Sequence, residues 1–458
     1  MSDTITAIAT PMGEGGLSVI RVSGLAALSI ASGLFRPAQS VPKKEFIPQR
    51  VYFGEILDPD SQTIVDEVLL TYFKAPKSFT AEDVVEISAH GGLFVTTKIL
   101  QLLKDQGARL AEPGEFTRRA FLNGRIDLSQ AEAVTDVIHA ASERALRSAL
   151  AQLKGSLSTQ LNDWFERLLA VLAQLEASID FSEEGLEFQK RETSLQEIQA
   201  IQKGIEALIQ TYRQGKIFRE GAHVVLLGKP NVGKSSLLNA LLNEDRAIVT
   251  PMPGTTRDTL EERVRIHDIH INLIDAAGLR QNPESIEKEG IKRAKAALDR
   301  ADLALVIFDA SNPLDKNDDL LIQEVTGKPH RVLLNKSDLK EHLDMHALQE
   351  KFPDAEFIRV SAKSGTGLTK LCASIYQFVV GDSSLNETLV ITRERHRQCL
   401  DAANTALIKS CASLEQNLSE EFVAVDIQIA MDRLAIILGK TFEDDLLDQI
   451  FGEFCIGK

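Results

Sequence analysis

The spacing of hydrophobic residues changes along the chain, and each change marks a different kind of structure. In the first part, about residues 1–118, β-branched and alternating runs bounded by Pro, Gly or Asp predict strands, and three- to four-residue spacing predicts helices. The combination indicates an α+β domain. The strands are expected over residues 4–9, 17–22, 51–57, 65–73 and 84–89, and the helices over 26–34 and 95–103.

The next part has a helical period throughout. Leucines at three- and four-residue steps from Leu146 to Leu175 predict one long helix with a continuous apolar seam, and a second helix is expected over about 195–212. Two such helices cannot bury both seams without further partners. The C-terminal part supplies them with the same period. We therefore expect one discontinuous helical domain, formed by residues 119–218 and 382–458, with its later helices over 394–414 and 422–438.

Between these two halves, about residues 219–381, apolar strands alternate with helices. This alternation predicts an α/β domain with a mostly parallel, doubly wound sheet, whose loops at the carboxyl ends of the strands bind ligands. The fold class is thus multidomain, with an α+β N-terminal domain, a discontinuous helical domain and an inserted α/β domain. The inserted strands are expected over residues 224–227, 264–266, 271–274, 303–308, 332–334 and 357–360.

The first inserted strand leads into a phosphate-binding loop. Residues 228–235 read G-x-x-x-x-G-K-S, and a helical pattern follows them. Such glycines let successive N–H groups point at a phosphate, and the helix N-terminus favours the same anion. Lys234 can reach the β- and γ-phosphate oxygens, and the hydroxyl of Ser235 can bind Mg²⁺. A chance match in a Gly-rich turn is the alternative, and the correct flanks on both sides argue against it.

Four more motifs follow in later loops of the inserted domain: G-T-T-R-D from Gly254, D-A-A-G from Asp275, N-K-S-D from Asn335 and S-A-K from Ser361. An Asp carboxylate in the fourth of the five motifs can accept two hydrogen bonds from guanine, which adenine does not offer. Together they predict a GTPase, and the segment resembles the translation-factor-like GTPases. We expect nucleotide contacts from Asn231, Val232, Gly233, Lys234, Ser235, Ser236, Thr250, Pro251, Met252, Pro253, Gly254, Thr255, Thr256, Asp275, Ala276, Ala277, Gly278, Asn335, Lys336, Asp338, Ser361, Ala362 and Lys363.

Leu279 stands where Ras-like proteins carry a Gln that orients the attacking water. A leucine cannot hold that water, so another group must do so, and another charge must offset the γ-phosphate. Oxygens of Asn231 and of the segment 250–254 lie near the phosphates by motif position. A monovalent cation held by these oxygens is one way to supply the charge.

Composition narrows the function classes. The chain is 44% hydrophobic and 26% charged, as in ordinary globular proteins. No apolar run approaches the roughly 18 residues of a membrane span, and residues 1–16 lack the pattern of a signal peptide, so we expect a cytoplasmic protein without a membrane partner. The four cysteines form no C-x-x-C pair, which argues against a zinc site. The net charge of -15 means that a nucleic-acid partner needs local basic patches or a second protein.

The apolar period continues almost to the last residue, from Phe442 to Phe454. We therefore expect the tail to be docked, which would place Cys455 and Lys458 at a defined site.

Over its whole length the chain resembles the MnmE (TrmE) family of tRNA modification GTPases. The resemblance rests on the five motifs inserted into a helical domain, on T-P-M-G-E-G-G from Thr10 and R-V-S-G from Arg21, on P-G-E-F-T from Pro113 and on the terminal C-x-G-K. It implies an N-terminal domain (1–118) that binds tetrahydrofolate and dimerises, and a potassium-activated Ras-like G domain (219–381). With the flavin-dependent partner MnmG (GidA), the enzyme would add an aminomethyl or carboxymethylaminomethyl group to C5 of the wobble uridine, U34, of certain tRNAs. The one-carbon donor would be a 5-formyl- or 5,10-methylene-tetrahydrofolate.

The resemblance also implies roles by motif position. Three residues would be catalytic: Glu287 would position the attacking water, Lys234 would act at the phosphate oxygens, and Cys455 would take part in the modification in a role that stays unassigned. FAD would enter only through the partner, in a heterotetramer-type complex of the homodimer with MnmG. The implied ligand sets are Arg21, Glu86 and Arg125 for the folate, Ser235 and Thr256 for Mg²⁺, and Asn231, Thr250, Met252 and Thr255 for K⁺.

Two other classes share parts of this pattern. A ribosome-assembly GTPase switch would carry a basic RNA-binding module, such as a KH domain with G-x-x-G. A membrane-remodelling GTPase would need a basic amphipathic or apolar membrane-facing segment. The sequence offers neither segment.

Overall fold

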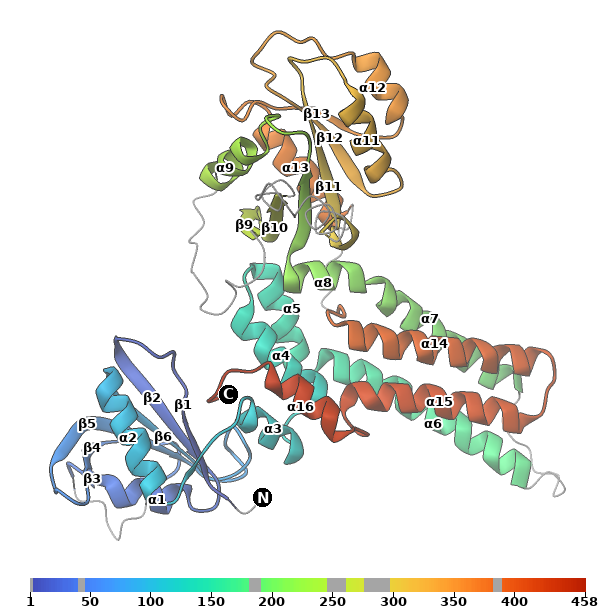
Figure 1. Ribbon diagram of the computed structural model, residues 1–458. Coiled ribbons are helices and arrows are strands. Elements are labelled where there is room, and N and C mark those ends of the chain that lie inside the picture. Colours follow the sequence, from blue (N-terminus) through green and yellow to red (C-terminus); the bar gives the residue numbers. More distant parts are fainter. Residues whose placement is uncertain (1–2, 40–45, 181–190, 245–260, 276–296, 382–388) are drawn as a thin grey trace, which may run out of the picture. The chain divides into compact units, whose positions relative to one another are not determined.

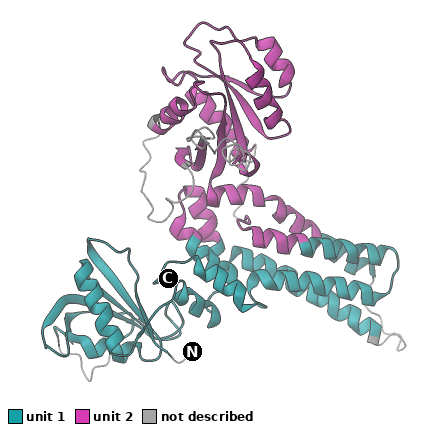
Figure 2. Ribbon diagram, viewed as in Figure 1, with its two compact units in different colours: residues 1–135, 152–201, 402–458 teal, residues 136–151, 202–401 magenta. Residues whose placement is uncertain are grey.

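The computed structural model describes residues 3–39, 46–180, 191–244, 261–275, 297–381 and 389–458 (Figure 1). The chain forms two compact units. One comprises Met1–Thr135, Gln152–Ile201 and Ala402–Lys458, and the other Asp136–Ala151 and Gln202–Asp401 (Figure 2). Within the described ranges, every helix is too short or too polar to cross a membrane.

A seven-stranded sheet organises the N-terminal part of the first unit. Its strands follow the order β3-β4-β5-β6-β2-β1-β7, and alternate residues such as Ile20, Val22 and Ile87 bury one face against two helices. The predicted alternation is confirmed, because side chains at every second position of a strand point to the same face. The strands are β1 (Ile5–Ile8), β2 (Gly15–Ser23), β3 (Phe35–Pro37), β4 (Val51–Leu57), β5 (Ile64–Phe73), β6 (Val84–Gly91) and β7 (Arg109–Leu110), and the helices are α1 (Ala27–Leu34) and α2 (Leu93–Asp105).

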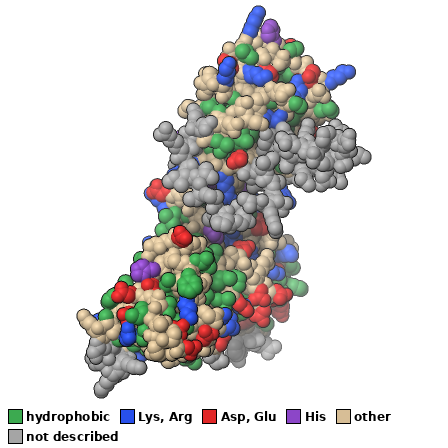
Figure 3. Space-filling view, turned by 60° about the vertical axis from the view of Figure 1, so that its left-hand side comes forward, with side chains coloured by type: hydrophobic (Ala, Val, Ile, Leu, Met, Phe, Trp, Pro, Cys, Tyr) green, Lys and Arg blue, Asp and Glu red, His purple; other side chains and the backbone are tan. Residues whose placement is uncertain are grey.

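The opposite face of this sheet is open at one end. Arg21 pairs with Glu86 across β2 and β6, and Glu86 pairs with Thr71 of β5. On the same face Leu69 and its partner Phe53 are 42% and 52% exposed. Figure 3 shows one side of the whole molecule, on which hydrophobic side chains lie between charged ones. A row of polar pairs thus lies beside an exposed apolar row.

Long helices complete the first unit, where α6 lies along α15 (Figure 1). Their buried leucines, Leu161 and Leu168 on α6 and Leu434 on α15, are those of the predicted seam. The helices are α3 (Glu115–Leu122), α4 (Leu128–His139), α5 (Glu143–Leu153), α6 (Ser156–Asp180), α7 (Arg191–Gln210), α14 (Glu394–Glu415), α15 (Glu420–Leu438) and α16 (Asp444–Gly452), and α4, α5, α7 and α14 continue across the boundary between the units.

The prediction of one long helix from Leu146 to Leu175 is wrong. The helix is interrupted between α5 and α6, where Gly155 adopts a left-handed φ of +88°. The side-chain amide of Gln130 donates a 3.0 Å hydrogen bond to the carbonyl of Leu153 and satisfies the end of α5. The apolar period runs through this break without a change, so periodicity alone cannot reveal it.

The inserted domain has a six-stranded sheet in the order β13-β12-β11-β8-β10-β9. All neighbours are parallel except the β9–β10 hairpin, and hydrophobic cores lie on both faces. The predicted doubly wound sheet, and with it the multidomain fold class, is confirmed. The elements are β8 (Ala222–Leu227), β9 (Glu261–Ile266), β10 (Ile269–Asp275), β11 (Leu303–Asp309), β12 (His330–Asn335), β13 (Phe357–Arg359), α8 (Tyr212–Glu220), α9 (Lys234–Glu244), α11 (Lys316–Val325), α12 (Met345–Lys351) and α13 (Leu368–Val380).

Candidate functional site

The loop between β8 and α9 has the geometry of a phosphate-binding loop. Asn231 has a φ of +63° and Gly233 a φ of +96°, so the backbone curls through two left-handed positions. A Cβ on Gly233 would overlap the side-chain amide of Asn335, so this position admits only glycine. The loop leads directly into α9, whose N-terminus favours anions.

Lys234 is held inside this loop. Its ammonium donates hydrogen bonds of 2.7 Å and 2.6 Å to the carbonyl oxygens of Gly228 and Lys229, and the residue is 6% exposed. Ser235 and Ser236 follow it as exposed residues in the first turn of α9. The predicted phosphate-contacting side chains therefore begin one helix together.

The motifs predicted to read the base meet at the ends of neighbouring strands. Asp338 accepts a 2.7 Å hydrogen bond from the hydroxyl of Ser361, and this bond is the main reason why the pKa of Asp338 lies below its usual value. Lys336 donates a 2.6 Å hydrogen bond to Asp309 at the end of β11. Burial by itself would raise the pKa of Asp309, but the ammonium of Lys336 and the hydroxyl of Ser311 lower it overall. Both carboxylates are thus ionised acceptors at neutral pH.

A polar cavity of about 530 Å³ opens beside the phosphate-binding loop. Asn231 and Lys336 line it, together with the N-terminal end of α11. There the ammonium of Lys229 pairs with Asp315 at 2.9 Å and with Asp318 at 2.7 Å. The pairing offsets part of the negative charge that these two carboxylates place near the loop. The cavity joins residues of the first and fourth predicted motifs.

Several predicted residues lie outside the described part of the chain. They are the catalytic candidate Glu287, the loop residues Thr250, Pro251, Met252, Pro253, Gly254, Thr255 and Thr256, and Ala276, Ala277 and Gly278. Of Asp275 only the backbone is described, at the carboxyl end of β10. Their assigned contacts with nucleotide, Mg²⁺ and K⁺ therefore stay predictions.

Two of the three residues assigned to the folate, Arg21 and Arg125, lie against Phe79 in the first unit, and the third, Glu86, pairs with Arg21. Arg21 donates hydrogen bonds of 2.9 Å and 2.7 Å from Nε and Nη2 to one carboxylate oxygen of Glu86. Arg125 donates from Nη1 to the carbonyl oxygen of Phe79. Sequence reasoning missed Phe79, because it lies in a Pro- and Ser-containing loop where no apolar period marks its half-buried ring.

The docked tail reaches the same group. Ile456 forms an antiparallel bridge with Pro113, and the carbonyl oxygen of Gly457 accepts a 3.3 Å hydrogen bond from Arg21. A Cβ on Gly457 would overlap the carbonyl oxygen of Ile8, so only glycine allows this approach. The prediction of a docked tail is confirmed. Cys455 is exposed at its end, and the apolar residues that anchor the tail are Leu447, Ile450, Phe451 and Phe454, against Phe121, Leu128 and Ala131.

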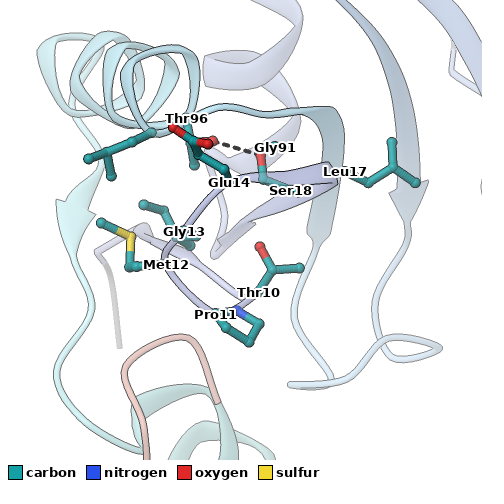
Figure 4. Close-up of a pocket in the computed structure, with 12 residues that line it drawn as sticks. Thr10, Pro11, Met12, Gly13, Glu14, Leu17, Ser18, Gly91 and Thr96 are labelled. Atoms are coloured by element: carbon teal, nitrogen blue, oxygen red, sulfur yellow. Dashed lines mark hydrogen bonds between the residues drawn. The ribbon is translucent and has the colours of Figure 1, made fainter. Parts of the chain in front are cut away.

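A hollow of about 320 Å³ in the first unit lies under the loop that connects β1 to β2 (Figure 4). Met12 and Gly13 of the loop border it, and Thr96 donates a 2.8 Å hydrogen bond to Ser18 at its wall. Arg21, Glu86 and Arg125 do not line this hollow. The T-P-M-G-E-G-G motif and the folate candidates therefore form separate features of the described structure.

Comparisons with known proteins match the whole chain. A family model described as the MnmE helical domain matches residues 128–455, and one described as the GTP-binding protein TrmE N-terminus matches residues 4–125. The chain is 44% identical to a tRNA modification GTPase MnmE of Thermoanaerobacter pseudethanolicus over 457 residues, which cover 100% of this chain and 99% of that protein.

Other proteins match as well. A tRNA modification GTPase MnmE of Alkaliphilus metalliredigens is 43% identical, and the match covers 100% of each chain. Among solved structures, a variant of Aquifex aeolicus Era bound to GDP and aluminium fluoride is 27% identical over 41% of this chain and 66% of that chain, with a TM-score of 0.29. By the two family models and the full-length relatives, the chain belongs to the MnmE family of tRNA modification GTPases.

Proposed function

We propose that this chain binds and hydrolyses GTP as part of a tRNA modification reaction. One observation carries the proposal: the buried side chain of Asn335 bonds both Val232 of the phosphate-binding loop and the main chain of Ala362 in the last motif. A purine nucleotide that extends from Lys234 to Asp338 fits this order of loops. An ionised Asp338 favours guanine, because the N1 and N2 donors of guanine match the two oxygens of one carboxylate. Membership of the family supports the same activity.

The chemistry on tRNA is proposed from the family resemblance. Together with MnmG (GidA), which would bring FAD, the chain adds an aminomethyl or carboxymethylaminomethyl group to C5 of U34. The net charge of -15 supports a shared task, because a chain of this charge repels the phosphate backbone on average. A second protein or a local basic patch is then needed to hold the tRNA.

Cations complete the proposed hydrolysis site. Ser235 lies exposed beside the buried Lys234 in the first turn of α9, which suits a Mg²⁺ ligand. Asn231 lines the cavity beside the loop, which suits an oxygen ligand of K⁺. When bound, both cations offset charge that develops on the phosphates. Thr256 would join Ser235, the K⁺ set would add Thr250, Met252 and Thr255, and Glu287 would position water.

The N-terminal domain is proposed to bind a tetrahydrofolate between two copies of the chain. Arg21 and Glu86 lie on the sheet face that also carries the exposed side chains of Phe53 and Leu69. A second copy that covers this apolar row would also enclose the neighbouring row with Arg21 and Glu86. Arg125 completes the folate set. A homodimer would therefore build the ligand site and bury the exposed apolar surface.

Complementation in cells that lack this gene tests the proposal. The wild-type chain should co-purify with a flavoprotein and restore the modified wobble uridine in tRNA, measured by mass spectrometry of nucleosides. Lys234→Ala should lose GTP hydrolysis and modification together, whereas Cys455→Ser should keep hydrolysis and lose modification. Hydrolysis without any change in tRNA nucleosides, combined with a defect in ribosomal subunits, would instead favour a ribosome-assembly switch.

A further inference from the structure

Phe79 lies between two arginines of the first unit. The guanidinium carbon of Arg21 is 5.1 Å from the centre of the Phe79 ring, and that of Arg125 is also 5.1 Å from it. Arg21 additionally lies 5.6 Å from the ring centre of Phe116. Cations within about 6 Å of a ring centre are attracted by the negative face of the ring. One aromatic side chain thus contacts both cations of the proposed folate set.

The Phe79 ring is held by its own packing and by the hydrogen bonds of the residue that follows it. Phe79 packs against a small buried core formed by Ile5, Ala7, Ala111 and Phe116. The next residue, Thr80, is completely buried, shares a 2.7 Å hydrogen bond with Ser23, and accepts another at its carbonyl from Asn123. The position of Phe79 is therefore set by the domain core and does not depend on the two arginines.

The two arginines differ in how their charge is balanced. Arg21 pairs with the Glu86 carboxylate at 2.7 Å. Within the described residues Arg125 forms no ion pair with a carboxylate, and its guanidinium donates to the Phe79 carbonyl oxygen. Burial lowers the pKa of Arg125, and no carboxylate opposes that effect. Although its contact with the loop withdraws part of the guanidinium from water, Arg125 is exposed as a residue. A cation that contacts a ring and a carbonyl, with no carboxylate partner in the described part of the chain, retains its capacity to bind an anion.

We propose that Phe79 is a positioning residue of the ligand site, which holds Arg21 and Arg125 as a cation pair and presents Arg125 to a carboxylate of the bound molecule. This inference rests on the proposed folate function. The ring stabilises both guanidinium groups in fixed orientations, so less side-chain entropy is lost when the ligand binds. Arg21, already neutralised by Glu86, then serves as the fixed partner of the pair.

Two substitutions separate the aromatic face from simple packing. Phe79→Leu keeps an apolar side chain but removes the π face, and Phe79→Tyr keeps the face. With the full-length dimer and 5-formyl-tetrahydrofolate, calorimetry should show a Kd about tenfold higher for Phe79→Leu and nearly unchanged for Phe79→Tyr. Phe422→Leu, at an exposed position of α15, is the control for the same change elsewhere. The melting temperature should stay as in the wild type for Phe79→Tyr and Phe422→Leu, and it should fall by only a few degrees for Phe79→Leu, which loses part of its packing on the small core.

A readout without folate tests the positioning itself. Phenylglyoxal labelling of arginines, mapped by mass spectrometry, should modify Arg125 several times faster in Phe79→Leu than in the wild type, with Arg147 as the internal reference because its side chain is 77% exposed. Wild-type folate affinity together with wild-type labelling in Phe79→Leu overturns the proposal. If the wild type binds no folate but the labelling of Arg125 still accelerates, the positioning role holds and the proposed folate function fails.

Discussion

The side-chain amide of Asn335 donates a 2.7 Å hydrogen bond to the main-chain carbonyl of Val232. Through this bond the loop after β12, which would read the base, is tied to the loop after β8, which would hold the phosphates. Asn335 is 2% exposed and also accepts a 3.2 Å hydrogen bond from the main chain of Ala362. Three motifs that are far apart in the sequence therefore depend on one buried amide.

Replacement of this amide tests the connection. Asn335→Ala removes the partner of the buried Val232 carbonyl and of the half-buried Ala362 N–H. Leaving a buried polar group unpaired costs roughly 1–3 kcal/mol. We expect GDP affinity to fall by more than tenfold and the melting temperature of the G domain to decrease. Gln323→Ala, at an exposed position of α11 away from the cavity, should change neither quantity. Nucleotide binding unchanged in Asn335→Ala would show that the loops are fixed by other contacts.

Asp338 decides the choice of base in our second prediction. Asp338→Asn replaces a charged acceptor by an amide, so GTP affinity should fall by on the order of 100-fold. Xanthosine triphosphate should gain affinity, because its C2 carbonyl needs a donor that Asn supplies. Titration of both nucleotides against wild type and variant measures the exchange. Equal GTP affinity in the two proteins would remove Asp338 from the base-reading site.

The third prediction concerns the monovalent cation. GTP turnover should be much faster in K⁺ than in Na⁺ or Li⁺, since a cation in the place of an arginine finger is worth on the order of 10³ or more in rate. Asn231 has a φ of +63° and lines the cavity beside the loop, where its oxygen can face such an ion. Asn231→Ala should remove the K⁺ stimulation and leave GDP binding largely intact.

Glu287→Ala provides the companion variant for this test. It should slow hydrolysis without removing K⁺-dependent dimerisation of G domains, because the glutamate is assigned to water and not to the cation. Turnover that is equal in K⁺ and Na⁺ at matched ionic strength contradicts the cation role.

The C-terminal tail gives a fourth prediction. Gly457 has a φ of +96°, and a Cβ there would lie 3.1 Å from the Cα of Ala9 and still closer to the Ile8 carbonyl oxygen. Gly457→Ala should displace the tail from Arg21, so that tRNA modification falls while GTP hydrolysis persists. Gly452→Ala is the matched control, because its Cβ would meet no atom within 4 Å. Limited proteolysis of the tail should accelerate only in Gly457→Ala.

Acid stability supplies the fifth prediction. Burial alone would raise the pKa of Glu115, but hydrogen bonds from Arg109, the Glu112 main chain and Arg119 lower it below the usual 4.5. The stability contributed by these contacts is fully present above pH 4.5 and is lost as pH falls through the lower, folded-state value.

Glu115→Gln tests this dependence. At pH 7 the variant should lose about 3 kcal/mol in the free energy of unfolding, because it leaves the charge of Arg119, which is 1% exposed, with fewer partners. Below pH 4 the difference from the wild type should shrink. Denaturant titrations at the two pH values measure both effects, and a difference that stays constant with pH would exclude the linkage.

Local sequence patterns were sufficient to predict the parts of this protein whose residues lie close together in the sequence. The loop from Gly228 to Ser235 could be read from the sequence because a strand, a glycine-containing turn and a helix follow one another without an intervening partner. The parallel strands were predicted in the same way, and alternation over residues 17–22 and 84–89 predicted the strands that carry Arg21 and Glu86. Each of these features depends on neighbours within a few residues or on a fixed period of the backbone.

Contacts between distant segments were decided only by the tertiary structure. The break at Gly155 lies within a continuous apolar period, and Gln130 from another helix satisfies the broken end. Phe79 joins Arg21 and Arg125 only because the loop, the sheet and the segment after α3 meet there. Gly457 reaches Arg21 across 436 residues of sequence. Such contacts leave no trace in local periodicity, because their energy comes from groups that the folded backbone alone brings together.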